Sequence, residues 1–210
     1  MAVSARDRTA SAKKGKTQEI DFYFDPVCPW AWRTSLWIRE VAKVRPITIH
    51  WKFLSLESIN TTRPGGQVKE SHLTARDPFK VMALVRREEG DEAVDRLYLA
   101  LGRARHDRKE NFGERDVLLA CLDESGLDRG LLDRALADES IKQEIDREQE
   151  AIAAIGGFGV PTIVLEGFDP LFGPVINPVP TGEDAGQMWD HFEYFLRRPD
   201  FFELKREIRR

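Results

Sequence analysis

Residues 19–32 read EIDFYFDPVCPWAW, and this stretch decides the fold. Its apolar, aromatic first half belongs to the run Gln18–Phe24, which ends at Asp25-Pro26 and so predicts a buried strand followed by a turn. A helix is expected from Pro29, because a proline suits the first helical turn, where its missing N–H has no partner. Cys28 is therefore predicted to lie where the first strand ends and the first helix begins.

The residues after Pro29 continue the pattern of a βαβ unit. Apolar residues recur at helical spacing up to Arg45-Pro46, which predicts a helix buried on more than one side. In Ile47–Phe53 apolar and polar residues alternate strictly, which is typical of a strand with one solvent-exposed face at or near the edge of a sheet. Strand, helix and strand in about forty residues predict a right-handed crossover.

A helical block follows a loop that is expected over residues 60–67. Five helices are predicted: one opened by Asp77-Pro78, then further ones with apolar stripes, the third carrying Cys121 on its apolar side. Ser140 is expected to cap the fifth, and Gly156-Gly157 to stop it.

The end of the chain returns to strands. Residues 160–165 and 171–175 are expected to pair, Thr181 to begin a capping box before a helix, and Asp200 to cap a last helix. The order βαβ, helices, ββα predicts an α/β protein with a thioredoxin fold split by a large all-helical insertion of the DsbA-like kind. The expected domains are 18–67 with 158–210 for the thioredoxin-like part and 68–157 for the insertion, after a disordered leader or added segment at 1–17.

The composition of the chain excludes several classes of function. The chain of 210 residues has a net charge of -4, so a nucleic-acid partner is not expected. No segment has the length of a membrane span, and the first residues lack the apolar core of a secretory signal. Two cysteines do not make a disulfide scaffold, and four scattered histidines do not predict a metal site. A cytoplasmic protein is expected.

Cys28 is the candidate nucleophile. At a helix start, unpaired backbone N–H groups and the positive end of the helix dipole face the sulfur, and both favour the thiolate, which is the reactive form. Trp30 is expected to form an apolar wall beside the sulfur. The alternative interpretation, a small buried hydrophobic residue, is the usual one for a lone cysteine, but the strand-end and helix-start position favours catalysis.

The second candidate element is Val160-Pro161-Thr162. A proline that opens a strand is ordinarily trans and structural. Beside Cys28 and within this topology, the prediction is a cis Val160-Pro161 bond packed against the cysteine, with the backbone of Val160 facing an extended substrate.

These motifs carry a family resemblance. The stretch FYFDPVCPW together with Val160-Pro161-Thr162 resembles the DsbA-like oxidoreductases. The segments LFGPV, PTGEDAGQMW and FFELKR near the C-terminus resemble the actinobacterial branch named mycothiol-dependent nitroreductases. The resemblance implies a cytosolic enzyme without flavin that uses a low-molecular-weight thiol, with mycothiol expected, and a thiol-binding cleft that includes Pro29, Trp30 and residues 160–162.

The comparison with that family adds two polar residues, and it shows one position at which this sequence differs from the family pattern. Asn60 and His106 fall where the family has polar cleft residues; a turn asparagine and a solvated histidine remain equally open. Relatives usually read Cys-Pro-Trp-Cys, whereas this chain has Ala31 at the second position, so no thiol one helical turn away can attack a mixed disulfide on Cys28. Cys121 is expected to be an inert buried thiol.

The expected reaction is attack of the Cys28 thiolate on a disulfide or an electrophilic small molecule, followed by resolution by a second small thiol. One alternative is a kappa-type glutathione transferase or isomerase, which activates glutathione without forming a mixed disulfide. The other is a redox-dead binding module. The oligomeric state is open between a monomer and a homodimer.

Overall fold

The computed structural model describes residues 17–207, so nearly all of the expected leader lies outside the described part of the chain. Its centre is a four-stranded sheet in the order β2-β1-β3-β4. The strands are β1 (Gln18–Phe24), β2 (Ile47–Phe53), β3 (Thr162–Leu165) and β4 (Leu171–Phe172). Strands β1 and β2 are parallel, whereas β3 is antiparallel to both β1 and β4. The expected βαβ start, with β2 at an edge, is confirmed.

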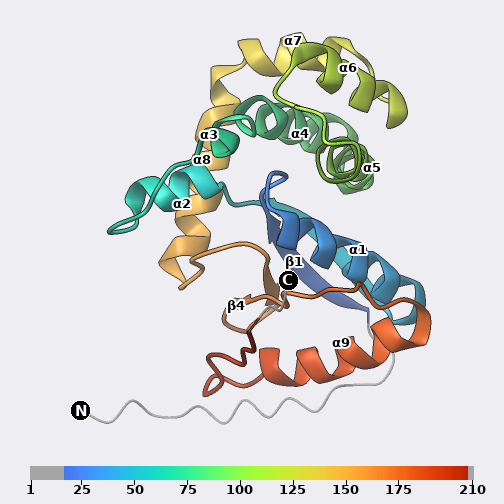
Figure 1. Ribbon diagram of the computed structural model, residues 1–210, viewed down its shortest axis with the longest axis vertical. Coiled ribbons are helices and arrows are strands. Elements are labelled where there is room, and N and C mark those ends of the chain that lie inside the picture. Colours follow the sequence, from blue (N-terminus) through green and yellow to red (C-terminus); the bar gives the residue numbers. More distant parts are fainter. Residues whose placement is uncertain (1–16, 208–210) are drawn as a thin grey trace.

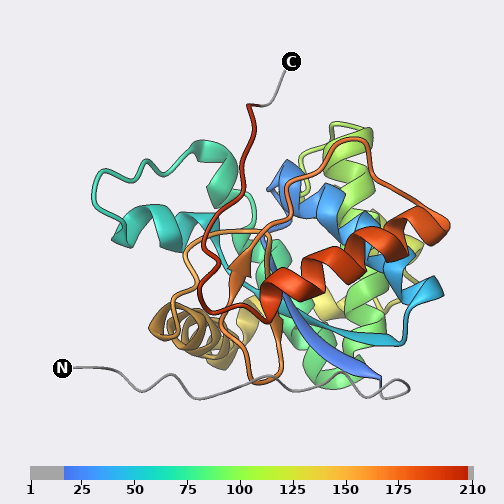
Figure 2. The ribbon, with the colours of Figure 1, turned by 90° about the horizontal axis from the view of Figure 1, so that it is seen from below.

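Helices α1 (Pro29–Val44) and α9 (Gly182–Leu196) pack against each other beside the sheet, as Figure 2 shows. Trp37 of α1 is fully buried between them and donates its indole N–H to the carbonyl of Ala185, at 3.2 Å. Arg45, just after α1, pairs with Glu183 and Asp190 of α9, at 2.7 and 2.8 Å. The first and last of the described helices are therefore joined by both apolar and ionic contacts.

A block of helices lies between β2 and β3 in the sequence. It contains α2 (Leu56–Thr62), α3 (Glu70–Leu73), α4 (Arg76–Glu89), α5 (Asp91–Gly102), the π-helical turn η1 (Arg103–Asp107), α6 (Arg115–Glu124), α7 (Gly130–Ala137) and α8 (Glu139–Ala154). Its part from α3 to α8 is the helical insertion. Figure 1 shows α4 to α7 gathered at one end of the molecule and α9 at the other, with α8 returning from the helical end toward the sheet.

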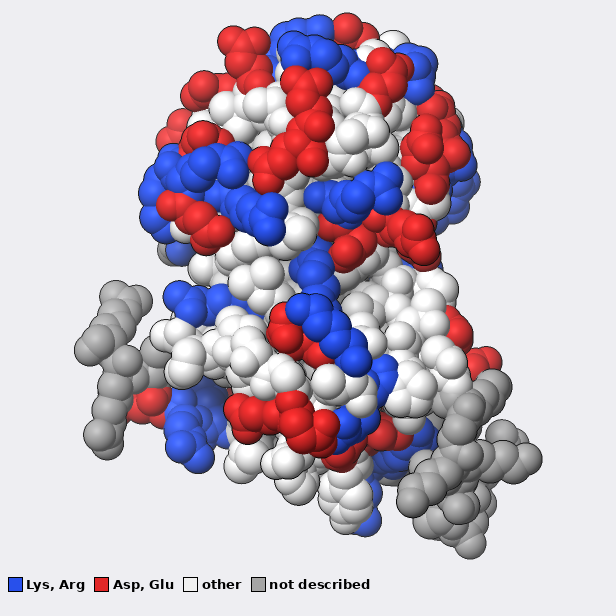
Figure 3. Space-filling view, turned by 90° about the vertical axis from the view of Figure 1, so that its right-hand side faces the viewer, with Lys and Arg blue, Asp and Glu red and all other residues white. Residues whose placement is uncertain are grey.

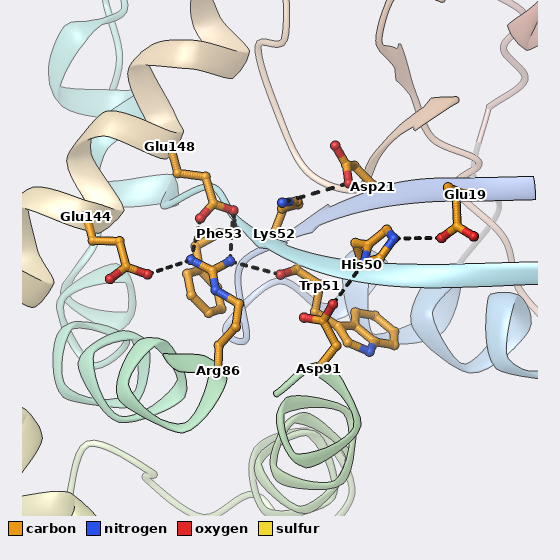
Figure 4. A network of polar contacts seen from close by, with 10 residues as sticks. All are labelled: Glu19, Asp21, His50, Trp51, Lys52, Phe53, Arg86, Asp91, Glu144 and Glu148. Carbon is orange, nitrogen blue, oxygen red and sulfur yellow. Dashed lines mark hydrogen bonds and ion pairs between the residues drawn. The ribbon is translucent and has the colours of Figure 1, made fainter. Parts of the chain in front are cut away.

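Arg86 of α4 anchors this insertion to the sheet edge (Figure 4). Its guanidinium donates to the Trp51 carbonyl of β2 at 3.1 Å and lies 4.3 Å from the centre of the Phe53 ring. It also pairs with Glu148 and Glu144 of α8, at 2.6 and 3.1 Å. Because the arginine is largely removed from solvent, one side chain ties β2, α4 and α8 together.

His50 makes a second link at the same edge. Its two ring nitrogens face Glu19 of β1 at 2.7 Å and Asp91 at the start of α5 at 2.9 Å (Figure 4). Hydrogen bonding to these carboxylates, Asp91 first, raises the pKa of His50 above its ordinary value. The helical block thus contacts the polar face of the edge strand at His50, whereas Thr48 of the same face stays exposed.

Several expected details are wrong. Residues 60–62 end α2 and are not loop, since Ser55 caps that helix by accepting from the N–H of Glu57 at 3.1 Å. Asp138, not Ser140, caps α8, because its carboxylate accepts from the Ser140 N–H at 2.9 Å.

The C-terminal strands and caps are also shorter or simpler than expected. Strand β4 ends at Phe172, before Pro174, which has no N–H to donate to a ladder. The side chain of Thr181 makes no capping bond to α9. No last helix follows Asp200 within the described residues 201–207, and its carboxylate pairs with Arg198 at 2.6 Å instead.

Candidate active site

Cys28 is the N-cap residue of α1, as the sequence predicts. Its Sγ accepts the N–H of Ala31 at 3.5 Å, one of the unpaired amides of the first helical turn. On its other side the thiol donates to the carbonyl oxygen of Val160 at 3.7 Å. The side chain is 6% exposed, so the sulfur lies just under the surface between the helix start and the segment before β3.

That segment has the predicted form. The Val160-Pro161 peptide bond is cis, which confirms the expectation, and Val160 contacts Cys28 directly. The hydroxyl of buried Thr162 donates to the Gly159 carbonyl at 2.7 Å, and the Pro161 carbonyl accepts the N–H of Gly173 at 2.8 Å. Three hydrogen bonds therefore hold the chain beside the sulfur.

The protonation of Cys28 differs from the sequence-based expectation. Burial raises the pKa of the Cys28 thiol to about 11, and the N–H groups of Ala31 and Trp30 oppose this only in part. The helix-start amides are oriented as expected, but desolvation outweighs them in this closed arrangement. In this arrangement the thiol form is therefore favoured near neutral pH.

Asp25, three residues before the cysteine, is a site residue that the sequence analysis missed. It is fully buried, and its carboxylate accepts the N–H of Val27 at 2.9 Å and the N–H of Leu56 at 2.7 Å. Burial raises the pKa of Asp25 to about 7. Its carboxylate fixes the turn that carries Cys28 and joins that turn to the start of α2.

His106 lies beside the same turn, as the resemblance suggested. Its Nε2 lies 2.9 Å from the Pro26 carbonyl oxygen, and its ring stacks on Trp32 with centroids 5.9 Å apart. Trp32 can reach it because Gly102 has no side chain: a Cβ there would lie 2.1 Å from the indole ring. Trp32 and Gly102 were missed, although the glycine just before RARH, inside a helical pattern, indicates a close approach of another group.

Of the other predicted residues, Pro29 and Asn60 line two separate hollows. One hollow, of about 410 Å³, is lined by Val27, Pro29, Arg105, His106 and Lys109. A second, of about 560 Å³, is lined by Asn60 and residues of the loop and helix that follow it, including Arg63, Lys69 and His72. Asn60 lies on α2 and donates to the Leu56 carbonyl at 2.7 Å. The backbone N–H of the same Leu56 donates to the Asp25 carboxylate, so α2 connects Asn60 with the turn before Cys28. Trp30 is half-buried against the core, and Ala31 is fully buried beneath the sulfur.

Cys121 is fully buried on α6, as predicted, and burial raises its pKa to about 11. Within residues 17–207, no three His, Cys, Asp or Glu side chains are grouped so that they could hold a metal ion. In the same part of the chain no helix is both long and apolar enough to cross a membrane.

Solved structures define the fold of this protein. The cytosolic disulfide reductase DsbM from Pseudomonas aeruginosa, solved with GSH, superposes with a TM-score of 0.60 at 15% identity, over 84% of this chain and 99% of that one. A 2-hydroxychromene-2-carboxylate isomerase gives 0.61 at 16% identity, over 84% and 93%, and DsbA from Pseudomonas aeruginosa gives 0.53 at 18%, over 86% and 83%. At these identities the similarity shows the fold alone. It is a DsbA-like thioredoxin fold with a helical insertion, as predicted.

Sequence comparison identifies the family. The family model described as Rv2466c-like, mycothiol-dependent nitroreductase Rv2466c, matches residues 27–206. The Mycobacterium tuberculosis protein Rv2286c, itself named as uncharacterized, is 35% identical over 193 residues, which are 89% of this chain and 81% of that protein. The chain therefore belongs to the Rv2466c-like family, and the resemblance found in its sequence is confirmed.

Proposed function

We propose that this protein is a cytoplasmic thiol–disulfide oxidoreductase in which Cys28 forms a mixed disulfide that a low-molecular-weight thiol, mycothiol, resolves. One observation carries the proposal: the Cys28 sulfur lies between a helix-start N–H at 3.5 Å and the carbonyl of Val160 at 3.7 Å. A sulfur in this position can be stabilised as a thiolate on one side while an extended substrate lies against the other.

The chemistry has two exchange steps. The Cys28 thiolate attacks one sulfur of a disulfide, the Cys28–sulfur bond forms, the substrate S–S bond breaks, and the other half leaves with the electron pair as a thiolate. An external thiolate then attacks the sulfur bound to Cys28, forms a new disulfide and releases the Cys28 thiolate. Ala31 offers no thiol, and Cys121 is fully buried on α6, so the resolving thiol comes from solution.

The identity of the small thiol rests on two comparisons. The family is described by a mycothiol-dependent enzyme, and a solved structure of the same fold was obtained with glutathione. The proposed contacts for thiol and substrate are Pro29, Trp30, Ala31, Asn60, His106 and residues 160–162. No flavin has a part in the proposed reaction, and a monomer or a homodimer would serve it equally.

The test is intact mass spectrometry of the protein with the disulfides of mycothiol and of glutathione. We expect an adduct of one thiol on the wild type and on Cys121→Ser, and none on Cys28→Ser. Release of the adduct should require added thiol, fastest with mycothiol. An adduct that survives Cys28→Ser would contradict the assignment of the nucleophile.

Two other functions give different results in that experiment. A glutathione transferase or isomerase activates the thiol without bonding to it, so no adduct would form on Cys28 while glutathione-dependent turnover would be present. A redox-dead binding module would bind a thiol reversibly and give neither adduct nor turnover. The isomerase similarity concerns the fold and does not favour the first alternative.

We also propose the division into a thioredoxin-like part, residues 18–67 with 158–210, and a helical insertion, residues 68–157. Both boundaries lie in segments without helix or strand, at 63–69 and 155–161. Limited proteolysis should cut first in these two segments, and first cuts within α4 or α5 would contradict the division.

A further inference from the structure

The hollow beside the nucleophile is basic. Its lining begins with Val27 and Pro29, the two neighbours of Cys28 in the sequence, and continues with Arg105, His106 and Lys109. No aspartate or glutamate lines it. In a chain whose net charge is -4, this excess of positive charge is not explained by composition.

The two cations of the hollow have no carboxylate partner in the part of the chain that the structure describes. The Arg105 guanidinium lies 5.8 Å from the centre of the Phe112 ring, and Lys109 donates to the carbonyl of His106. Elsewhere most arginines are paired with acidic side chains, and Figure 3 shows basic and acidic residues interspersed over the helical end. An unpaired cation pair in a concave site is an arrangement that binds an anion.

His106 contributes a neutral ring to this hollow. Because the Pro26 carbonyl can only accept, the Nε2 atom that faces it at 2.9 Å carries a hydrogen. Burial lowers the pKa of His106, and the neighbouring charges of Arg105 and Lys109 lower it further. The positive charge of the hollow therefore resides on Arg105 and Lys109.

Backbone geometry at this place is unusual. Arg105 and His106 lie in the π-helical turn η1, closed by the Arg108 N–H and the Arg103 carbonyl at 2.9 Å, and Lys109 has a φ of 62°. Such turns occur frequently at functional sites. Asp107, the acidic residue of the turn, is exposed and does not line the hollow.

We propose that the disulfide attacked by Cys28 carries a carboxylate, which Arg105 and Lys109 hold in the hollow while the sulfur lies against Cys28. The inference rests on the proposed thiol–disulfide chemistry and adds a substrate class to it. The step is unchanged: the sulfur of the carboxylate-bearing half bonds to Cys28, the S–S bond breaks, and the other half leaves as a thiolate. Charge-assisted hydrogen bonds to a carboxylate are the strong ones, so the anion selects the substrate.

The test compares 3,3′-dithiodipropionate with its neutral diamide, 3,3′-dithiodipropionamide, which has the same carbon chain and the same S–S bond. The rate of Cys28 adduct formation is measured by intact mass at pH 7.5 for each disulfide, and the rate with the dicarboxylate is divided by the rate with the diamide. The same ratio is measured for the reaction of the two disulfides with a small free thiol in solution, and the protein's ratio is divided by it to remove the intrinsic difference in reactivity. We expect a preference of about tenfold for the dicarboxylate, corresponding to ~1.4 kcal/mol, and its decline at 0.5 M KCl.

Variants locate the effect. Arg105→Gln and Lys109→Gln should each reduce the preference toward that of the free thiol and leave the rate with the diamide unchanged. The matched control is Arg129→Gln, whose arginine pairs with Asp123 at 2.6 Å outside the hollow and should retain the full preference.

The outcomes separate the two levels of the proposal. If both disulfides label Cys28 with no preference beyond that of the free thiol, the substrate class is wrong and the oxidoreductase chemistry stands. If neither labels Cys28, the proposed function fails. If the variants slow both disulfides equally, Arg105 and Lys109 support the structure and hold no carboxylate, which also overturns the inference.

Discussion

Replacing Asp25 by asparagine tests the structural account of the active-site turn. The carboxyl is fully buried, and its pKa rises from 3.8 to about 7 on folding because burial penalises the charge. Between these values the folded chain binds a proton that the unfolded chain has lost. The free energy of unfolding of the wild type therefore falls as pH rises through this window, the reverse of the usual effect of an aspartate.

The magnitude follows from the two pKa values. From pH 5 to pH 8 the Asp25 proton is lost from the folded protein, and linkage gives a loss of about 3 kcal/mol from this one group. Asparagine has no such dependence, but its NH₂ cannot accept one of the N–H groups of Val27 and Leu56, which costs about 1–3 kcal/mol at all pH values. The variant should be clearly less stable than the wild type at pH 5 and close to it, or more stable, at pH 8.

The assay is urea unfolding of both proteins at pH 5, 6, 7 and 8, with Asp133→Asn as the matched control. Asp133 is exposed, and Arg115 lowers its pKa, so removing its carboxylate leaves the slope between pH 5 and pH 8 unchanged. Parallel curves for the wild type and Asp25→Asn would refute the assignment of a buried, protonatable carboxyl under Cys28.

Three further predictions concern the same site. Alkylation should label Cys28 before Cys121, since the first is 6% exposed at a helix start and the second is fully buried; the Cys28 rate should rise with pH toward about 11, and equal rates would contradict the site. In Ala31→Cys, a loaded small-thiol adduct should be expelled without added thiol and leave an internal disulfide with Cys28, whereas the Ala31 protein should retain it, as intact mass will show. Gly102→Ala should destabilise the chain by about 1–3 kcal/mol in denaturant unfolding, because the added carbon would lie 2.1 Å from Trp32; an unchanged midpoint would show that the indole moves freely.

Local patterns predicted the first half of the thioredoxin part closely. The bounds of β1, α1 and β2 follow from the spacing of apolar residues and from the prolines and the aspartate that lie next to the ends of these elements. The position of Cys28 at a helix start follows from the same signals. The contact of Cys28 with Val160 joins distant parts of the chain, and it was predicted from the order of strands and helices together with the position of Cys28.

The properties of the site that could not be predicted from the sequence depend on burial by residues far along the chain. Asp25 looks like a turn residue in the sequence, and only its bond to the N–H of Leu56, thirty-one residues away, makes it a buried carboxyl. The Cys28 thiol was expected to be ionised because the helix start is a local feature, whereas the desolvation that reverses this depends on residues far along the chain. The length of β4 is a different case, because the proline that ends it is a local signal that the sequence already contains.

The contact between Cys28 and Val160 has a consequence for biosynthesis. Its partners are 132 residues apart, and β3, which carries the second one into the sheet, is made after the whole helical insertion. At roughly 5–20 residues per second, a nascent chain therefore presents this thiol without its cover for roughly 7–26 s, a period in which β1, α1 and β2 can already have paired. The thiol that is 6% exposed in the folded protein is therefore accessible to solutes, oxidants included, for that part of its synthesis.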